Sequence, residues 1–238
     1  MTNVNTLIKG AASLGIDLKE DEVNNFILYK ELLKSWNQKI NITSITDDEE
    51  IDIKHFIDSL TPLTTKLIKD GGRLIDIGTG GGFPGIPLKI VKKDLEVILL
   101  DSLNKRINFL KEVIEKLNLE KVMAIHGRAE DFGRDLEHRE QYDIAISRAV
   151  APLNTLAEYS LPFVKVGGYF IAMKGKDVDE ELKEAKRAIE ILGGELKEKL
   201  LVDLPFSDIT HSLIIIEKKT KTSTKYPRGA GKPKKRPL

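Results

Sequence analysis

Short apolar runs alternate with longer amphipathic segments from residue 72 onward, and this alternation limits what the chain can fold into. The segment 102–118 has apolar residues three or four positions apart, which is helical spacing, and 178–192 repeats it. Strands that alternate with helices predict βαβ units around a mostly parallel sheet. We expect seven strands, with no helix between the last two, at residues 74–77, 97–100, 122–125, 144–146, 169–173, 196–204 and 212–217.

The first 70 residues have a different pattern, which predicts helices. Apolar residues from Val23 to Trp36 follow one helical stripe, and those from Ile53 to Leu67 follow another. Between them lies a polar break, followed by an acidic run at 47–50 that favours the start of a helix. We therefore expect three parts, which are a helical amino-terminal cap over 1–70, an α/β domain over 71–217 and a basic tail over 218–238.

The composition excludes several kinds of chemistry. None of the 238 residues is cysteine, so disulfide scaffolds, cysteine-rich zinc sites and thiolate nucleophiles are ruled out. The four histidines are scattered without metal-ligand spacing, and we predict no metal site. No run approaches the roughly 18 apolar residues of a membrane span, and the first residues lack the pattern of a signal peptide. We expect a cytoplasmic protein, monomeric and without a membrane partner.

Charge is distributed unevenly along the chain. Residues 218–238 hold nine basic groups and no acid, whereas the rest has 29 basic and 37 acidic residues, a net charge of −8. An acidic body with a basic tail indicates a polyanionic partner at one edge. The alternative is a solvated tail that only aids solubility, and charge alone does not decide between the two.

The segment 74–87 (LIDIGTGGGFPGIP) carries the most information about a ligand. An apolar strand runs into a glycine-dense turn, where the absence of Cβ atoms lets the backbone come close to a ligand. A dinucleotide site needs a small residue at the end of G-x-G-x-x-G, but Phe83 stands there. Asp76, Gly78 and Gly80 fit instead the motif that holds S-adenosylmethionine in class I methyltransferases. The ammonium and sulfonium groups of that cofactor make a nearby acid useful, whereas a dinucleotide brings phosphates.

Two further candidate positions follow the next strands. Asp101 comes 21 residues after Gly80, a spacing at which a carboxylate can accept hydrogen bonds from ribose hydroxyls. Asp101 can also cap the helix that follows it, and the two roles can coexist. After the third strand, Ala129 and Glu130 are candidates for contacts to an adenine edge, with an ordinary surface loop as the alternative.

The fourth strand ends in Ser147-Arg148-Ala149. Methyltransferases that act on exocyclic amines usually have Asn/Asp-Pro-Pro-aromatic at this place, and methylation of pyrimidine C5 requires a cysteine nucleophile. The chain has neither feature, so two common kinds of base methylation are disfavoured.

Several segments together resemble one family. They are 76–87, 101–106, 128–130, 147–149 and the YPRGAG motif at 226–231, with Trp36-Asn37, 41–43 and 55–60. The chain is similar, over nearly its whole length, to the bacterial RsmG family of 16S rRNA guanine-N7 methyltransferases, formerly called glucose-inhibited division protein B. FPGIP directly after the turn is more specific than the turn alone. The family is expected to have an arginine where this chain has Lys54. Lysine keeps the positive charge, but it cannot make the two parallel hydrogen bonds of a guanidinium.

The resemblance implies a class I methyltransferase fold, Rossmann-like, with a helical amino-terminal extension and S-adenosylmethionine as cofactor. It also implies methyl transfer to N7 of one guanine in the decoding-region loop of 16S rRNA, in the small ribosomal subunit. The positions that match the family's cofactor contacts are Gly78, Phe83, Ala129, Glu130 and Arg148. Spacing adds Gly80, Asp101 and Asp76, although an acid inside a strand can also simply brace the turn. With rRNA as substrate, the basic tail is expected to follow phosphates.

Guanine N7 is an unprotonated lone pair, so its attack on a sulfonium methyl removes no proton in the transition state. We therefore predict no general base and no covalent catalyst. Catalysis is expected to come from holding N7 and the methyl in line, with Arg148 orienting the cofactor or the target base.

Other functions stay open on sequence alone. One is a methyltransferase with a small-molecule or protein acceptor, and another is a non-catalytic RNA-binding protein with a relic cofactor fold. A nicotinamide dehydrogenase fits least, because Phe83 occupies the position that needs a small residue.

Overall fold

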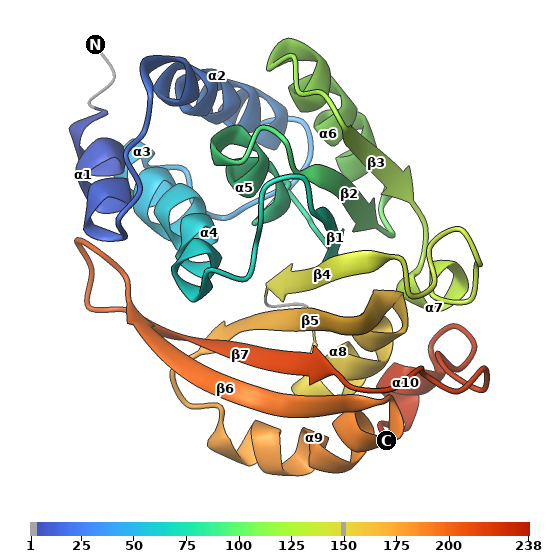
Figure 1. The fold of residues 1–238 in the computed structure, drawn as a ribbon. Helices are drawn as coiled ribbons and strands as arrows, with labels where there is room; N and C mark the ends of the chain where they lie inside the picture. The colour runs from blue at the N-terminus through green and yellow to red at the C-terminus, as the bar shows by residue number, and fades with distance from the viewer. Residues whose placement is uncertain (1–3, 149–150) are drawn as a thin grey trace.

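Residues 4–148 and 151–238 are described by the computed structural model. Within these ranges, seven strands form one sheet in the order β3-β2-β1-β4-β5-β7-β6 (Figure 1). Neighbours among β1 to β5 pair in parallel, whereas β7 runs antiparallel to β5 and β6. This confirms the predicted sheet. The strands are β1 (Arg73–Ile77), β2 (Glu96–Asp101), β3 (Val122–His126), β4 (Tyr142–Arg148), β5 (Val164–Gly175), β6 (Gly194–Asp203) and β7 (Thr210–Lys218).

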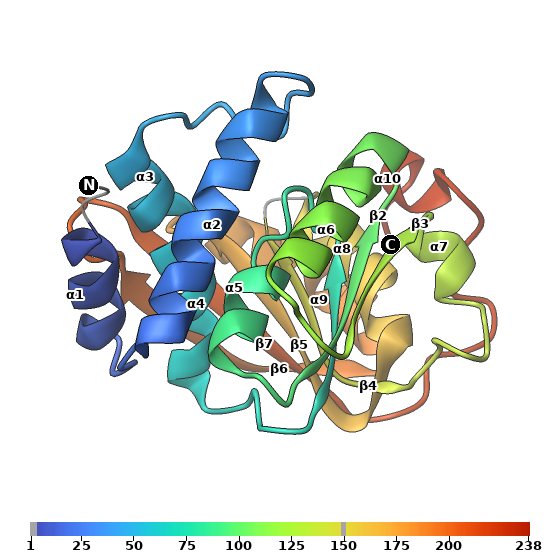
Figure 2. The ribbon, with the colours of Figure 1, turned by 90° about the horizontal axis from the view of Figure 1, so that it is seen from above.

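Helices cover both faces of the sheet (Figures 1 and 2). One face carries the amino-terminal helices with α5 and α6, and the other carries α8 and α9. The helices are α1 (Asn5–Ser13), α2 (Glu20–Asn37), α3 (Asp48–Ile51), the π-helix η1 (Asp52–Ile57), α4 (Asp58–Leu60), the 3-10 turn η2 (Thr61–Thr65), α5 (Gly85–Val91), α6 (Asn104–Lys116), α7 (Ala129–Phe132), α8 (Leu153–Ser160), the 3-10 turn η3 (Leu161–Phe163), α9 (Asp179–Ile191) and α10 (Lys232–Lys235). None of the described helices is long and apolar enough to cross a membrane.

The central strands are apolar because both of their faces are buried. In β1, Leu74 belongs to the core beneath the amino-terminal helices, while Ile75 and Ile77 belong to the core beneath α8 and α9. Successive side chains of a strand point to opposite faces, so one short apolar run supplies both cores.

The amino-terminal helices share a core with the α/β unit. Phe56 is fully buried, and its ring centroid lies 5.0 Å from that of Phe26, 5.3 Å from Tyr29 and 6.3 Å from Phe83. Since Phe83 belongs to the glycine-dense turn after β1, this aromatic cluster attaches the cap directly to that turn.

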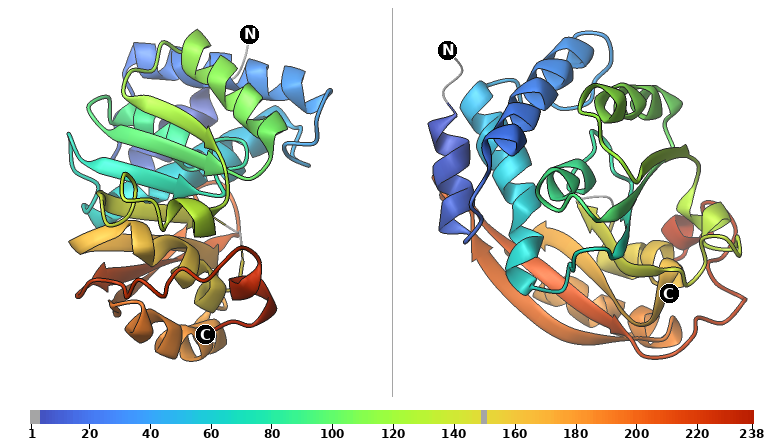
Figure 3. Two further views of the ribbon diagram at one scale, coloured as in Figure 1. Left: turned by 90° about the vertical axis from the view of Figure 1, so that its right-hand side faces the viewer. Right: turned by 45° about the horizontal axis from the view of Figure 1, so that its top comes forward.

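Parts of the basic tail are packed against the protein, although most of its lysine side chains are exposed. Strand β7 runs through Lys218, whose side chain is buried and donates to the carbonyl oxygen of Leu161 at 2.6 Å. Beyond it, the chain returns along α7 and α8 to α10 (Figure 3). Arg139 donates to the carbonyl oxygens of Thr222 and Tyr226, at 2.6 and 2.8 Å.

Replacing Phe56 tests how tightly the cap is joined to the sheet. We expect Phe56→Ala to lower the free energy of unfolding by about 3–5 kcal/mol, because a buried aromatic ring is lost and a cavity is left. The control is Leu136→Ala, since Leu136 is 82% exposed. Urea denaturation measures both variants. Equal, small effects for the two would contradict a shared core.

Candidate functional site

The glycine-dense turn between β1 and α5 needs its glycines. Gly78, Gly80 and Gly82 have φ values of 70°, 62° and 95°, a region that side chains rarely adopt. At Gly82 a Cβ would lie 2.7 Å from the hydroxyl oxygen of Tyr29. That hydroxyl donates to the carbonyl oxygen of Gly81, so α2 holds the turn in place. At Gly80 no atom beyond its chain neighbours comes closer than 4.0 Å to the Cβ position, so the space beside this residue is open.

Asp76 braces this turn from inside the sheet. Its Oδ2 accepts hydrogen bonds from the hydroxyl of Thr79 at 2.7 Å and the amide of Gly85 at 2.9 Å. Burial raises the pKa of Asp76 to about 6, against the lowering effect of those two hydrogen bonds. Its Oδ1 is buried and has no hydrogen-bond partner within residues 4–148 and 151–238.

Asp101 connects the turn to the start of α6. Its Oδ2 accepts from the amide of Gly80 at 2.9 Å, and its Oδ1 accepts from the amide of Leu103 at 2.8 Å. The expected capping role is wrong, because α6 begins at Asn104 after the N-cap residue Leu103 and has no side-chain cap. The carboxylate of Asp101 instead fixes the residue before the helix and the second glycine of the motif. The backbone carbonyl of Asp101 also accepts from the amide of Gly127 at 3.0 Å, which ties the loop after β3 to this site.

The pair Ala129-Glu130 opens α7 beyond that loop. The side chain of Glu130 is buried, and its Oε1 accepts from the amide of Gly231 at 2.8 Å. The carboxylate of Glu130 is thus occupied by the tail, a contact that sequence reasoning did not anticipate.

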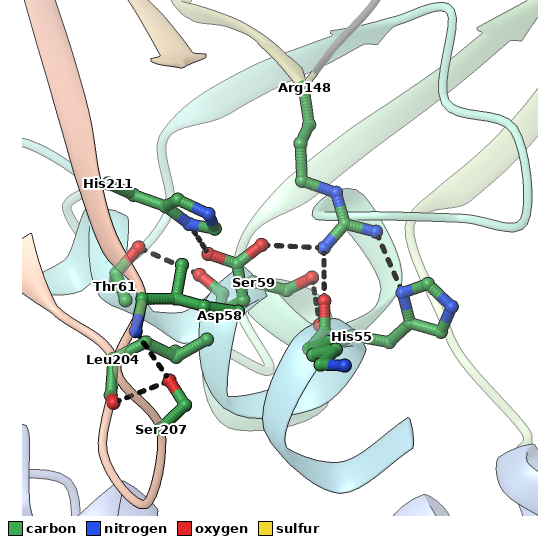
Figure 4. A network of polar contacts seen from close by, with 10 residues as sticks. His55, Asp58, Ser59, Thr61, Arg148, Leu204, Ser207 and His211 are labelled. Carbon is green, nitrogen blue, oxygen red and sulfur yellow. Dashed lines mark hydrogen bonds and ion pairs between the residues drawn. The ribbon is translucent and has the colours of Figure 1, made fainter. Parts of the chain in front are cut away.

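Arg148 lies at the centre of a polar network at the end of β4 (Figure 4). Its Nη1 donates to Asp58 Oδ2 at 2.8 Å and to the carbonyl oxygen of Lys54 at 3.1 Å, while Nη2 lies 3.3 Å from His55 Nδ1. Its guanidinium stands 5.0 Å above the ring of Phe83, which stacks on His55 at 4.5 Å. Arg148 is therefore fixed on several sides. Its neighbour in the predicted motif, Ala149, lies outside the described residues.

Hydrogen bonding fixes the protonation of this network. Burial, together with the charge of Arg148, lowers the pKa of His55 to about 4. A guanidinium can only donate, so Nδ1 of neutral His55 accepts and its Nε2 donates to Thr43 Oγ1 at 2.8 Å. Burial alone would raise the pKa of Asp58, but hydrogen bonds and charge from His211 and Arg148 hold it below its usual value. The hydrogen bond to Asp58, 2.7 Å long, raises the pKa of His211.

Three separate parts of the chain deliver these side chains. His55 lies on the π-helix η1, which continues into α4 with Asp58 as its first residue, and π-turns recur at functional sites. His211 pairs with Gly175 in the β5–β7 register. Because β7 is antiparallel, its beginning lies at the edge where the parallel strands end, beside Arg148.

A cavity of about 430 Å³ opens at this edge. Its walls are Lys54, His55, Asp58, Arg148, Met173, Lys174, Gly175 and His211. Lys174 donates to Glu181 at 2.9 Å and to the carbonyl oxygen of Ala151 at 3.0 Å. Among the described residues, no three His, Asp or Glu side chains gather in a way that could hold a metal ion.

Sequence reasoning found Arg148 and the family-like segment that contains His55, but it missed Asp58 and His211 as partners of Arg148. The two histidines of the network lie far apart in the sequence, and only His55 stood within a family-like segment. Asp58 belongs to the same segment, three residues after His55. In a helix this spacing puts the two side chains on one face, and it was the signal that could have identified Asp58. Nothing in the sequence pointed to His211, because its place depends on the antiparallel register of β7.

Comparison with known proteins assigns the chain to a family. The family model described as rRNA small subunit methyltransferase G (GidB) matches residues 22–203. The chain belongs to this family. A protein named ribosomal RNA small subunit methyltransferase G from Alkaliphilus oremlandii is 53% identical over 98% of this chain and 97% of its own length. Its namesake from Acetivibrio thermocellus is 55% identical over 98% of this chain and 95% of its own length.

A solved structure supports the fold independently. TYW2 from M. jannaschii, in complex with AdoMet, superposes with a TM-score of 0.52 and 18% identity, covering 67% of this chain and 76% of that one. The match extends over the sheet architecture expected of class I methyltransferases, although the sequences have diverged widely.

The residues of this family member fit an S-adenosylmethionine ligand chemically. The turn is open above Gly80, as a backbone cradle requires. Asp76 Oδ1 is a buried acceptor without a partner among the described residues, suited to a cationic ligand. The carboxylate of Asp101 stands beside the turn, and it keeps lone pairs beyond those used by its two backbone contacts and by Arg106, whose Nη1 lies 3.4 Å from Oδ2.

The pKa of His211 gives a stability test. A histidine with a pKa raised by folding stabilises the folded state below its unfolded pKa, and this contribution disappears as the pH rises through the folded pKa. We therefore compare the free energy of unfolding of the wild type with that of His211→Gln. The difference should be largest at a pH below 6.5, the ordinary pKa of histidine, and should shrink as the pH rises above it. Urea denaturation at about pH 5.5 and 8.5 measures this difference. His126→Gln is the control, because the ring of exposed His126 contacts only a backbone carbonyl among the described residues. The same pH trend in both variants would exclude Asp58 as its cause.

Proposed function

We propose that the chain transfers a methyl group from S-adenosylmethionine to N7 of a guanine in the decoding-region loop of 16S rRNA. Membership of the small-subunit rRNA methyltransferase G family over 22–203 carries this proposal. The intact glycine-dense turn and the arginine at the end of β4 support it. We propose further that the protein acts as a cytoplasmic monomer on the small ribosomal subunit.

In this proposal the cofactor lies along the carboxyl ends of β1, β2 and β3, where ligands of parallel α/β sheets bind. When bound, it supplies a methyl group activated by a sulfonium. The residues that would hold it are Gly78, Gly80, Phe83, Asp76, Asp101, Ala129, Glu130 and Arg148. Gly78 and Gly80 admit the ligand to the backbone, and Asp76 and Asp101 offer acceptors to its ammonium and hydroxyl groups.

The acceptor guanine would enter the cavity at the ends of β4 and β5. Arg148, Lys174 and His211 place donors around this cavity, which suits the carbonyl and phosphate oxygens of RNA. Arg148 is held by Asp58 and by the carbonyl oxygen of Lys54, so it can position a ligand without rearranging.

Two of the side chains around the cavity, His55 and Asp58, are not available as general bases, which leaves His211 as the group that the pH dependence of the reaction tests. The lone pair of His55 at Nδ1 faces Arg148, and both carboxylate oxygens of Asp58 are engaged by cationic or histidine donors. Neither group is free to take a proton. This matches attack by N7, which releases none in the transition state.

Base-free transfer predicts a simple pH dependence. We expect the single-turnover rate with saturating substrates to lack a unit-slope ascending limb between about pH 6 and 9, because no proton leaves the acceptor during methyl transfer. Rapid-quench measurement of labelled methyl incorporation gives this rate. An ascending limb of unit slope near neutrality would reveal a base and contradict the mechanism.

Arg148→Lys tests positioning. Lysine keeps the charge, but it cannot contact Asp58, His55 and the Lys54 carbonyl together, so we expect kcat/KM to fall about 10²-fold. Arg187→Lys, on the exposed side of α9, is the matched control. Steady-state methylation of 30S subunits measures both, and equal activity of the two variants would remove Arg148 from the site.

The direct experiment uses labelled S-adenosylmethionine with 16S rRNA and with 30S subunits, both from cells that lack this activity. Digestion of the RNA and separation of its nucleosides identifies the product. Label in 7-methylguanosine at one position supports the proposal and shows which substrate form is preferred. Transfer to another nucleoside, or none despite cofactor binding, would overturn the proposed acceptor.

A further inference from the structure

The carboxyl-terminal segment 222–231 is built into the protein through its backbone. Arg139 donates to carbonyl oxygens of this segment, and Arg134 Nε donates to the carbonyl oxygen of Pro227 at 2.7 Å. Both arginines lie in the connection between α7 and β4. The amide of Thr222 in turn donates to Glu140 Oε1 at 2.8 Å. Residues 222–227 are therefore bonded mainly to the stretch of chain that follows α7, and the ribbon runs beside it (Figure 3).

Arg228 forms the strongest anchor of this segment. Its Nε and Nη2 donate to the carboxylate of Glu158 at 2.9 and 2.6 Å, and its own backbone amide donates to Glu158 Oε1 at 2.7 Å. The side chain of Glu158, on α8, is only 1% exposed. A buried two-pronged pair of this kind fixes both the position and the direction of the chain.

Three residues further on, the segment reaches the loop after β3. The amide of Gly231 donates to Glu130 Oε1 at 2.8 Å, and Gly231 has a φ of 77°, which favours glycine. Pro233 behind it is buried, and its carbonyl oxygen accepts from Thr155 at 3.3 Å. The same loop is bonded on its other side to Asp101, through the amide of Gly127.

From these contacts we infer that residues 222–231 form a strap that holds Ala129-Glu130 in place, with Arg228 and Glu158 as positioning residues for cofactor binding. The inference rests on the proposed function, which gives Ala129 and Glu130 to the cofactor. Neither Arg228 nor Glu158 needs to touch the ligand. Their effect passes through Gly231 and Glu130 to the loop between β3 and α7.

Five of the nine cations in the tail fall into two groups with different contacts. Lys218 and Arg228 are held by protein groups and are not available to RNA. Lys234, Lys235 and Arg236 are exposed and form no ion pair within the described part of the chain. The first group stabilises the site, and the second can contact phosphates. Substitutions in one group should therefore leave the function of the other intact.

The test measures the affinity for S-adenosylhomocysteine by calorimetry, in the full-length protein without RNA. We expect Arg228→Ala to weaken binding about tenfold, within the usual range of coupling between two sites. The KM for 30S subunits should stay near that of the wild type. The control, Lys234→Ala/Lys235→Ala/Arg236→Ala, should show the reverse, with normal S-adenosylhomocysteine affinity and weaker RNA binding. Wild-type affinity in Arg228→Ala would overturn the strap.

Coupling to Glu130 separates positioning from a general loss of stability. If Arg228 acts through Glu130, then Glu130→Ala weakens binding at least as much as Arg228→Ala, and the double variant binds no more weakly than Glu130→Ala alone. Fully additive losses would overturn this route. Arg228→Lys should be intermediate, because it keeps one contact without the fork, and it serves if Arg228→Ala does not fold. A wild-type protein that fails to bind S-adenosylhomocysteine would instead overturn the proposed function.

Discussion

The ion pair between Arg148 and Asp58 joins the three parts from which the site is built. Asp58 belongs to the amino-terminal cap, Arg148 ends β4, and His211, the other partner of Asp58, begins β7. Asp58 is 2% exposed, and removing one member of a buried pair typically costs about 3–5 kcal/mol because the remaining charge is left unpaired. Folding of the cap and assembly of the site are therefore one event. A detached cap would leave Arg148 without the groups that fix its direction.

The cofactor side is held by the same kind of indirect support. Tyr29 from α2 bonds to the turn from one side, Asp76 bonds to it from within the sheet, and Asp101 fixes Gly80 from the next strand. Glycine allows the backbone conformation of the turn, but it also loses more conformational entropy on folding than other residues do. The surrounding hydrogen bonds hold the turn in that conformation, so the cradle is formed before any ligand arrives.

The sequence was sufficient where a local pattern determines a structure. Apolar runs such as 97–100 and the spacing in 178–192 predicted strands and helices that the structure contains, and the glycines of 78–82 predicted the turn that follows β1. It was insufficient where contacts depend on register or on packing between distant segments. His211 reaches Arg148 only because β7 is antiparallel, and the π-helical turn that presents His55 has no composition signal. The roles of individual cofactor residues remain predictions.

The tail shows why net charge is an incomplete guide to function. Nine basic residues in 218–238 predict a polyanionic partner. Two of them, however, donate hydrogen bonds within the protein itself, Lys218 to a backbone carbonyl oxygen and Arg228 to the carboxylate of Glu158. Burial lowers the pKa of Lys218 to about 8, although the charge of Glu140 acts in the opposite direction. The lowered pKa reflects the free energy needed to bury a charged hydrogen-bond donor. Long-range attraction to RNA depends on the exposed charges alone, because buried paired charges are largely neutralised by their partners. A single basic segment can thus contain both cations that bond within the protein, as Lys218 and Arg228 do, and cations that stay exposed, as Lys234 and Lys235 do.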